Sequence, residues 1–133
     1  MAHPNEELLR KMDAALDSGD MDMAFSYFAD DCIAHVGGRS ALAGDYKGGD
    51  ELKMTFGRFM QAMGEDPELE THDIVANDTH GFMLQTFKGK RGDKSITLNG
   101  LAVFHFANGK ISEAWFVDED PYAADAWYDE GLK

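Results

Sequence analysis

A histidine, an arginine, an aspartate and a tyrosine gather in the segment 28–48, FADDCIAHVGGRSALAGDYKG. His35 stands in a short apolar stretch, and a histidine titrates near neutral pH, so it can act as a general base or acid. Tyr46 can donate its hydroxyl to a ligand carbonyl, and Arg39 can bind a carboxylate. Such groups at the meeting point of apolar elements predict a ligand pocket, with His35 and Tyr46 as catalytic candidates and Arg39 as a substrate-binding candidate.

Each of these residues also has a structural interpretation. His35 can be a partly buried histidine bonded to a neighbour, Tyr46 a cover over the core, and Arg39 a solvated side chain. Asp45 is expected to close the turn before Gly48. Both interpretations remain open at this stage.

Two further polar residues accompany predicted strands. Alternate residues of a strand share a face, so Asp118 lies on the same face as Phe116, at the end of its strand. Asp118 is a third catalytic candidate, and its alternative is an exposed carboxylate in the acidic run 118–120. His72 is a candidate for substrate contact, and a direct pair with Asp73 is not expected because adjacent strand residues point to opposite faces.

Methionine and phenylalanine are frequent, with eight and nine residues respectively. Flexible thioethers adapt to irregular ligands, although such residues also fill ordinary cores. The following residues are expected to line a cavity: Met12, Met54, Phe59, Met60, Met63, Met83, Phe87, Leu98, Phe104 and Phe116.

Length, charge and composition exclude several classes of protein. The 133 residues fit one domain, 1–133, and 44% hydrophobic residues can fill its core. A net charge of −13 disfavours nucleic acid and anionic membranes. The single Cys32 excludes an intrachain disulfide, and no apolar run approaches the roughly 20 residues that span a bilayer. With no secretory signal at its start, the chain is expected to be cytoplasmic.

No metal or cofactor is expected. The histidines have no HxH or HxxxH spacing, and no CxxC occurs. The glycines lack the strand and helix context of a nucleotide-binding loop, and a GxSxG nucleophile motif does not occur.

Apolar periodicity predicts helices first and strands afterwards. Ser18-Gly19-Asp20 separates two helices, Asp50 is the expected N-cap of a third, and Gly64 ends it. Asn108-Gly109 predicts a two-residue hairpin turn. The expected strands are 32–36, 69–76, 82–88, 95–107 and 111–117, and the tail 121–131 is expected as a last short helix or an extended arm. This order predicts an α+β fold in which three N-terminal helices cover one face of a curved, mainly antiparallel sheet and enclose a cone.

The order of elements resembles the nuclear transport factor two-like superfamily, which includes ketosteroid isomerases, scytalone dehydratase and SnoaL-like cyclases. The chain is most similar to SnoaL-like bacterial proteins, through GRSALAGDYKG at 38–48 and LETHDIVA at 69–76. The resemblance implies that the face carrying Ala114, Phe116 and Asp118 lines the cone. It places Asp118 at the mouth, like the catalytic acid of the cyclases, and Trp115 on the opposite face.

Steroid isomerisation requires a carboxylate base, a tyrosine and a protonated aspartic acid. The alignment places Met12 at the tyrosine position and Ala102 at the acid position, while the base falls at His35 or Val36. That mechanism is therefore not expected.

Three functions remain open. The first is binding of a small apolar carbonyl compound with cofactor-free proton transfer, in which His35 is the base and Tyr46 or Asp118 its partner. The second is binding without catalysis. The third is a protein-interaction domain that uses the sheet face carrying Leu101, Val103 and Trp115. The uncovered sheet face also predicts a homodimer.

Overall fold

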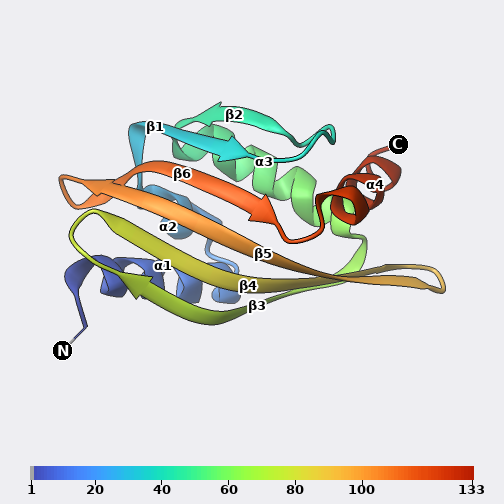
Figure 1. Cartoon of the computed structure of the whole chain (residues 1–133), viewed down its shortest axis with the longest axis horizontal. Helices are drawn as coiled ribbons and strands as arrows, with labels where there is room; N and C mark the ends of the chain where they lie inside the picture. The colour runs from blue at the N-terminus through green and yellow to red at the C-terminus, as the bar shows by residue number, and fades with distance from the viewer. Residues whose placement is uncertain (1) are drawn as a thin grey trace.

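The computed structural model describes residues 2–133 as helices packed against one face of a single open sheet (Figure 1). The elements follow in the order α1 (Pro4–Ser18), α2 (Met21–Ser26), β1 (Phe28–Val36), β2 (Gly44–Lys47), α3 (Gly48–Met63), β3 (Glu65–Ala76), β4 (His80–Arg91), β5 (Lys94–Ala107), β6 (Lys110–Asp118) and α4 (Pro121–Gly131). The predicted α+β cone is confirmed.

The sheet has six strands in the order β2-β1-β6-β5-β4-β3. Every neighbouring pair is antiparallel except β1 and β6, which run parallel. Asn108 and Gly109 join β5 to β6 with positive φ of 55° and 77°, as a tight hairpin turn requires. Because β1 pairs with β6, the first and the last strand of the chain lie side by side in one sheet.

Local sequence explains where most helices begin and end. Gly19 ends α1 in the left-handed region at φ 81°, and the Asp20 side chain then accepts from Met23 N at 3.1 Å to begin α2. Gly64 is the C-cap of α3, as expected. The helix begins earlier than expected, because Lys47 is its N-cap and Asp50 lies in its first turn.

One element differs from the expectation, since the segment 44–47 forms the short edge strand β2 rather than a loop. The tail forms the helix α4, the first of its two expected alternatives, in which Asp120 accepts from Ala123 N at 3.1 Å. The Trp127 indole fixes α4 against α3 by donating to Met63 O at 3.1 Å.

In the view of Figure 1, α1, α2 and α3 lie behind the sheet, α4 lies beside it after the end of β6, and the face of the sheet toward the viewer is uncovered. Alternate strand residues such as Ala34, Ala102 and Ala114 are 1% exposed or less and face the helices. Within residues 2–133, no helix combines the length and apolar character needed to cross a membrane.

Candidate functional site

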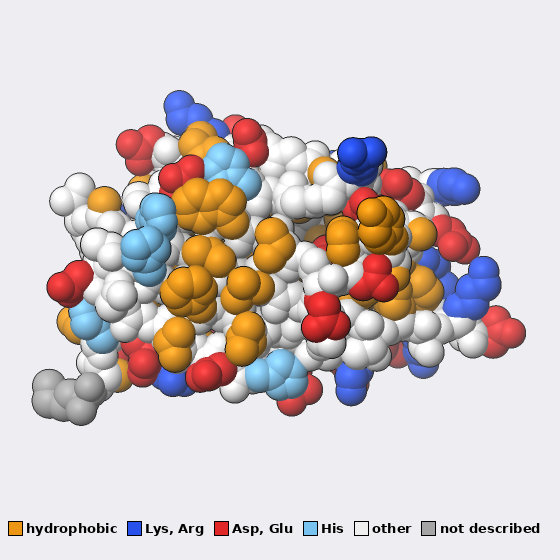
Figure 2. All heavy atoms as spheres, viewed as in Figure 1, with side chains coloured by type: hydrophobic (Ala, Val, Ile, Leu, Met, Phe, Trp, Pro, Cys, Tyr) orange, Lys and Arg blue, Asp and Glu red, His pale blue; other side chains and the backbone are white. Residues whose placement is uncertain are grey.

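A cavity of about 140 Å³ lies between the helices and the sheet, at the end where α4 closes over it. Phenylalanines from α2, β1, α3, β4, β5 and β6 contribute to its wall, together with leucine, methionine and other apolar residues. Among the described lining residues, four carry polar side chains: Thr55, Gln85, Asp118 and Tyr128. In Figure 2 the surface is hollowed where β6 leads into α4. A mostly apolar cavity with a few polar groups is typical of a small-molecule site.

Asp118 is an ionisable group of this cavity whose pKa is shifted toward neutral pH. It ends β6, on the same face as Phe116, and lines the hollow. Burial raises the pKa of Asp118 to about 6, the Tyr128 hydroxyl lowers it, and the nearby Asp125 carboxylate raises it further. A carboxyl group that titrates near 6 can both accept and return a proton at neutral pH.

Tyr128 positions its phenol beside that carboxyl group from the last helix. Its hydroxyl oxygen lies 3.4 Å from each Asp118 oxygen, long enough for a weak hydrogen bond only. Burial raises the pKa of Tyr128, as does the adjacent Asp118 charge. The phenol therefore stays protonated and can donate its hydrogen to Asp118 or to a ligand oxygen.

The loop 37–43 forms part of the mouth and is tied to α4. Asp125 Oδ2 accepts from Arg39 N at 2.9 Å, and Asp129 Oδ1 accepts from Ala41 N at 2.8 Å. The buried Leu42 of this loop lines the cavity. These bonds hold the loop and α4 together above Asp118.

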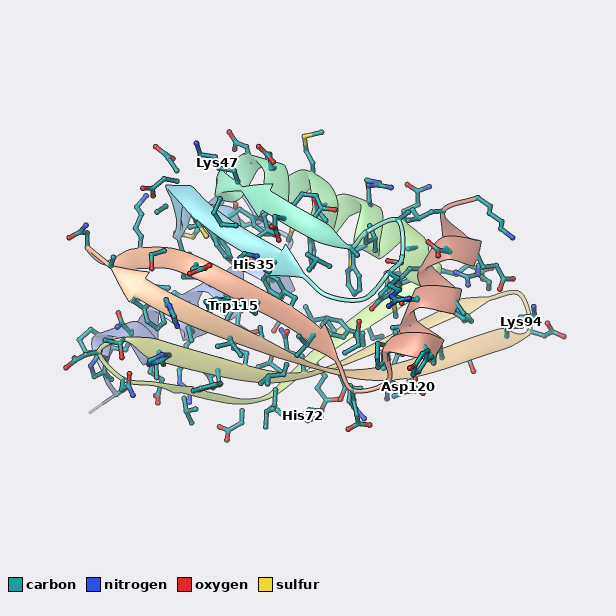
Figure 3. The ribbon with its side chains drawn as sticks, turned by 45° about the horizontal axis from the view of Figure 1, so that its top comes forward. His35, Lys47, His72, Lys94, Trp115 and Asp120 are labelled. Carbon is teal, nitrogen blue, oxygen red and sulfur yellow. The ribbon has the colours of Figure 1, made fainter. Side chains whose placement is uncertain are left out.

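His35 does not point into the cavity, which corrects the expected orientation. On β1, Ala34 and Val36 face the helices, so the histidine between them lies on the outer sheet face. Figure 3 shows it beside Trp115 of β6, with ring centroids 5.3 Å apart. Both ring nitrogens bind carboxylates: Nδ1 lies 2.7 Å from Asp45 Oδ1 and Nε2 2.7 Å from Glu113 Oε2.

Three more predicted polar residues, Tyr46, Arg39 and His72, also lie away from the cavity lining. The Tyr46 hydroxyl donates to Leu42 O at 2.6 Å, so it closes the loop rather than facing a ligand. Arg39 is exposed and contributes its backbone N–H to the contact with Asp125. His72 occupies a bulge of β3, where it contacts Thr86 and borders a shallow hollow on the outer face.

Most of the expected apolar wall is in place. Met12, Phe59, Met83, Phe87, Phe104 and Phe116 line the cavity. Met63 and Leu98 are corrections, because both are buried in the separate cluster under α4. Met54 is also corrected, since it is 73% exposed on the solvent side of α3, and Met60 is outside the lining.

The structure adds three polar lining residues that the sequence interpretation missed, namely Thr55, Gln85 and Tyr128. Tyr128 could have been found, because Ala124, Trp127 and Tyr128 have the spacing of one helix face after an Asp-Pro start. Gln85 gave no signal of its own. It faces the cavity because it alternates with Met83 and Phe87 along β4.

The SnoaL-like domain model matches residues 9–114, which is most of the chain. The protein belongs to the SnoaL-like domain family. Proteins of this family often bind small molecules and include polyketide cyclases and isomerases. No curated protein has a significantly similar sequence.

Solved structures share the SnoaL-like fold over almost the entire chain. Bal32a, from a soil-derived mobile gene cassette, has a TM-score of 0.85 and 29% identity, and the match covers 96% of this chain and 98% of Bal32a. TerC, co-crystallised with polyporic acid, has a TM-score of 0.80 and 16% identity, over 96% of this chain and 99% of TerC. An NTF2-like protein from Burkholderia thailandensis has a TM-score of 0.80 and 16% identity, over 100% and 99%. At 16% identity, the last two matches show the fold alone.

Within the described residues, no three His, Cys, Asp or Glu side chains are arranged to hold a metal ion. The cavity supplies a carboxyl group, a phenol, an amide and an apolar wall. This set can orient a small molecule and move a proton.

Proposed function

We propose that the cavity binds a compact, apolar, carbonyl-bearing molecule and that Asp118 transfers a proton on it without a cofactor. The observation that carries the proposal is the single carboxyl group in the apolar lining, with its pKa raised to about 6. General acid–base groups work best when their pKa lies near the working pH. A cyclase, isomerase or dehydratase reaction would use such a group.

The size and charge of the site support this choice of ligand. A cavity of about 150 Å³ can hold benzene, so about 140 Å³ encloses about one ring, and a second ring would extend into the mouth beside Asp118. Asp118 lines the mouth and is followed by Glu119 and Asp120, so an anionic ligand would meet repulsion there. A neutral ketone or phenol meets no such repulsion.

Asp118 and Tyr128 have distinct roles in the proposed reaction. The Asp118 carboxylate removes a proton from the carbon next to the carbonyl group, and the electron pair moves to the oxygen. The Tyr128 phenol keeps the carboxyl group in place and stays protonated throughout. The protonated Asp118 then returns its proton to the product.

Proton exchange of 2-tetralone in deuterated water tests this function directly. This two-ring ketone loses its C1 proton signals in NMR spectra when an enol forms. We expect wild-type protein to accelerate the exchange above the buffer rate, and Asp118→Asn to lower that acceleration by about 100-fold or more. Asp93→Asn, in the exposed β4–β5 turn, is the matched control. Equal exchange by Asp118→Asn and wild-type protein would refute the role of Asp118.

Binding is measured separately, by saturation-transfer NMR with the same ketone. Binding to both proteins without accelerated exchange would favour the second function, a binding domain without catalysis. Absence of binding would reject both ligand-based functions.

We also propose that the outer sheet face joins two copies of the chain. Apolar side chains lie next to each other across the strands of this face. One row runs Val75, Phe82, Val103 and Trp115, and the other runs Leu84, Leu101 and Val117. We call these seven residues the sheet-face patch, which is the orange area at the centre of Figure 2. Soluble monomers rarely expose a contiguous apolar surface of this kind.

A second copy fits the sheet-face patch because a twofold axis brings identical surfaces together. In the protein-interaction function, the same face would bind the partner protein.

We also propose a cytoplasmic location, because a free buried thiol at Cys32 fits a reducing compartment.

A further inference from the structure

Three neighbouring residues make a row across the cavity side of the sheet. Gln85 of β4 pairs with Gly100 of β5, and Gly100 pairs with Asp118 of β6. All three line the cavity. Because neighbouring strands lie about 4.8 Å apart, the backbones of Gln85 and Asp118 are separated by about 10 Å. The Gln85 amide and the Asp118 carboxyl group therefore lie on either side of Gly100, which has no side chain and forms the floor of the cavity there.

The space above Gly100 depends on its missing side chain. A Cβ atom there would lie 3.1 Å from Phe87 Cε2, 3.3 Å from Val117 O and 3.8 Å from Asp118 Oδ1. Gly100 has no positive φ, so its backbone does not require glycine. A methyl group would instead occupy the space between the Phe87 ring and the carboxyl group.

One weak hydrogen bond favours a particular orientation of the Gln85 amide. Gln85 is 8% exposed, and its Nε2 donates to Thr71 Oγ1 at 3.4 Å. The Thr71 hydroxyl donates in turn to Asp13 Oδ1 at 2.6 Å, so toward Gln85 it can only accept. The chain from Gln85 through Thr71 to Asp13 therefore leaves the second Nε2 hydrogen and Oε1 for other partners.

We infer that Gln85 is a second substrate-contacting residue and that the oxygen-bearing ring of the ligand lies over Gly100. The Gln85 amide donates to the carbonyl oxygen while the Asp118 carboxylate takes the proton from the adjacent carbon. The electron pair of that C–H bond moves to the oxygen, and the resulting enolate accepts from the Gln85 N–H group. Asp118 then returns the proton to carbon. This inference rests on the proposed function, because it adds a partner for the same carbonyl group.

These proposed contacts restrict the class of ligand that the cavity can bind. The ring must be planar to lie beside Phe87, and its oxygen must be uncharged before the reaction because Asp118 stands opposite. An enolisable cyclic ketone, or a phenol that mimics its enol, meets both requirements.

Binding of 2-naphthol and naphthalene tests the contact. The two probes have the same ring system, and the hydroxyl group of 2-naphthol reproduces the enol of 2-tetralone. Affinities are measured by titrating the intrinsic fluorescence of each probe. We expect wild-type protein to prefer 2-naphthol, and Gln85→Met to reduce this preference about 5- to 10-fold. The affinity for naphthalene should stay within about 2-fold, because methionine preserves the volume.

Gln61→Met is the matched control, since Gln61 is exposed on α3. It should leave the preference unchanged. An unchanged preference in Gln85→Met, with a melting temperature like that of wild-type protein, would overturn the inference.

Gly100→Ala tests the position of the ligand ring over Gly100 independently, and it replaces Gln85→Met if that variant does not fold. We expect its methyl group to weaken the binding of both probes about 10-fold or more, because it occupies the place of the ring. Unchanged binding of both probes would overturn the placement over Gly100.

The failure of this inference can be told apart from failure of the proposed function. If Asp118→Asn abolishes 2-tetralone exchange while Gln85→Met exchanges like wild-type protein, the role of Gln85 is wrong and the role of Asp118 stands. If Asp118→Asn exchanges like wild-type protein, the proposed function itself fails.

Discussion

His35 Nε2 lies 2.7 Å from Glu113 Oε2, and this contact joins the parallel strands β1 and β6 on the outer face of the sheet. On the other side of the ring, Asp45 binds Nδ1 from the edge strand β2. The hydrogen bonds that the His35 ring donates to the Glu113 and Asp45 carboxylates raise the pKa of His35. The imidazolium form therefore links three adjacent strands.

The first prediction concerns Glu113→Gln, which removes the stronger of the two causes of the raised pKa. We expect the His35 pKa, followed by NMR of the ring protons, to fall toward 6.5. A histidine with a raised pKa stabilises the fold fully below 6.5, and this stabilisation is lost as the pH rises through its folded pKa. The loss of melting temperature in Glu113→Gln should therefore be largest below pH 6.5.

Glu68→Gln, an exposed carboxylate of β3, is the control for that variant. A His35 pKa that is the same in wild-type protein and Glu113→Gln would contradict the role assigned to this contact.

A second prediction follows from the burial of Asp118. The folded pKa of about 6 lies above the unfolded value of about 3.8, so the folded state resists ionisation. Wild-type stability is therefore reduced as the pH rises from about 3.8 to 6 and stays reduced above it. Asp118→Asn should melt at a higher temperature than wild-type protein at pH 7 to 8, and at a similar temperature near pH 4. Calorimetry across this range checks it, and a difference that does not depend on pH would count against the raised pKa.

Asp125 provides a third prediction, because its charge raises the pKa of Asp118. Asp125→Asn keeps an oxygen that can accept from Arg39 N but removes the charge. The Asp118 pKa should fall, as measured by carbon-13 NMR of its carboxyl group, and the pH profile of 2-tetralone exchange should move to lower pH. Asp129→Asn is the control, since Asp129 binds the same loop through Ala41 N. Equal shifts in both variants would show that loop geometry, rather than charge, sets the pKa.

The sequence predicted most elements because their signals are local. Gly19 and Asn108-Gly109 occupy positions that need positive φ, and any other arrangement of these turns would be costly. The family resemblance then indicated that the face of β6 carrying Ala114, Phe116 and Asp118 lines the cone. Strand β2 was missed because its four residues are too few to carry a periodic pattern.

Local sequence signals could not show on which face of the sheet His35 lies. Strand alternation separates Cys32, Ala34 and Val36 from Ile33 and His35, but it does not say which set faces the helices. The apolar sheet-face patch makes both faces of the sheet hydrophobic, so polarity gave no answer. Gln85 was missed for a related reason, since its function depends on the pairing with Gly100 and Asp118 across three strands.

The last prediction concerns the sheet-face patch and the proposed homodimer. Leu84 is 49% exposed in the patch, beside Leu101 of β5 and two residues after Phe82 along β4. Leu84→Asp would place a carboxylate in the interface, where it would be desolvated in both copies without a partner. We expect wild-type protein to sediment as a dimer at micromolar concentration and Leu84→Asp as a monomer with similar circular dichroism. Met54→Asp adds the same charge on the exposed side of α3, which faces away from the patch, and should remain a dimer. A monomeric wild-type protein, or a Leu84→Asp dimer as stable as that of Met54→Asp, would mean that a second copy does not cover this face.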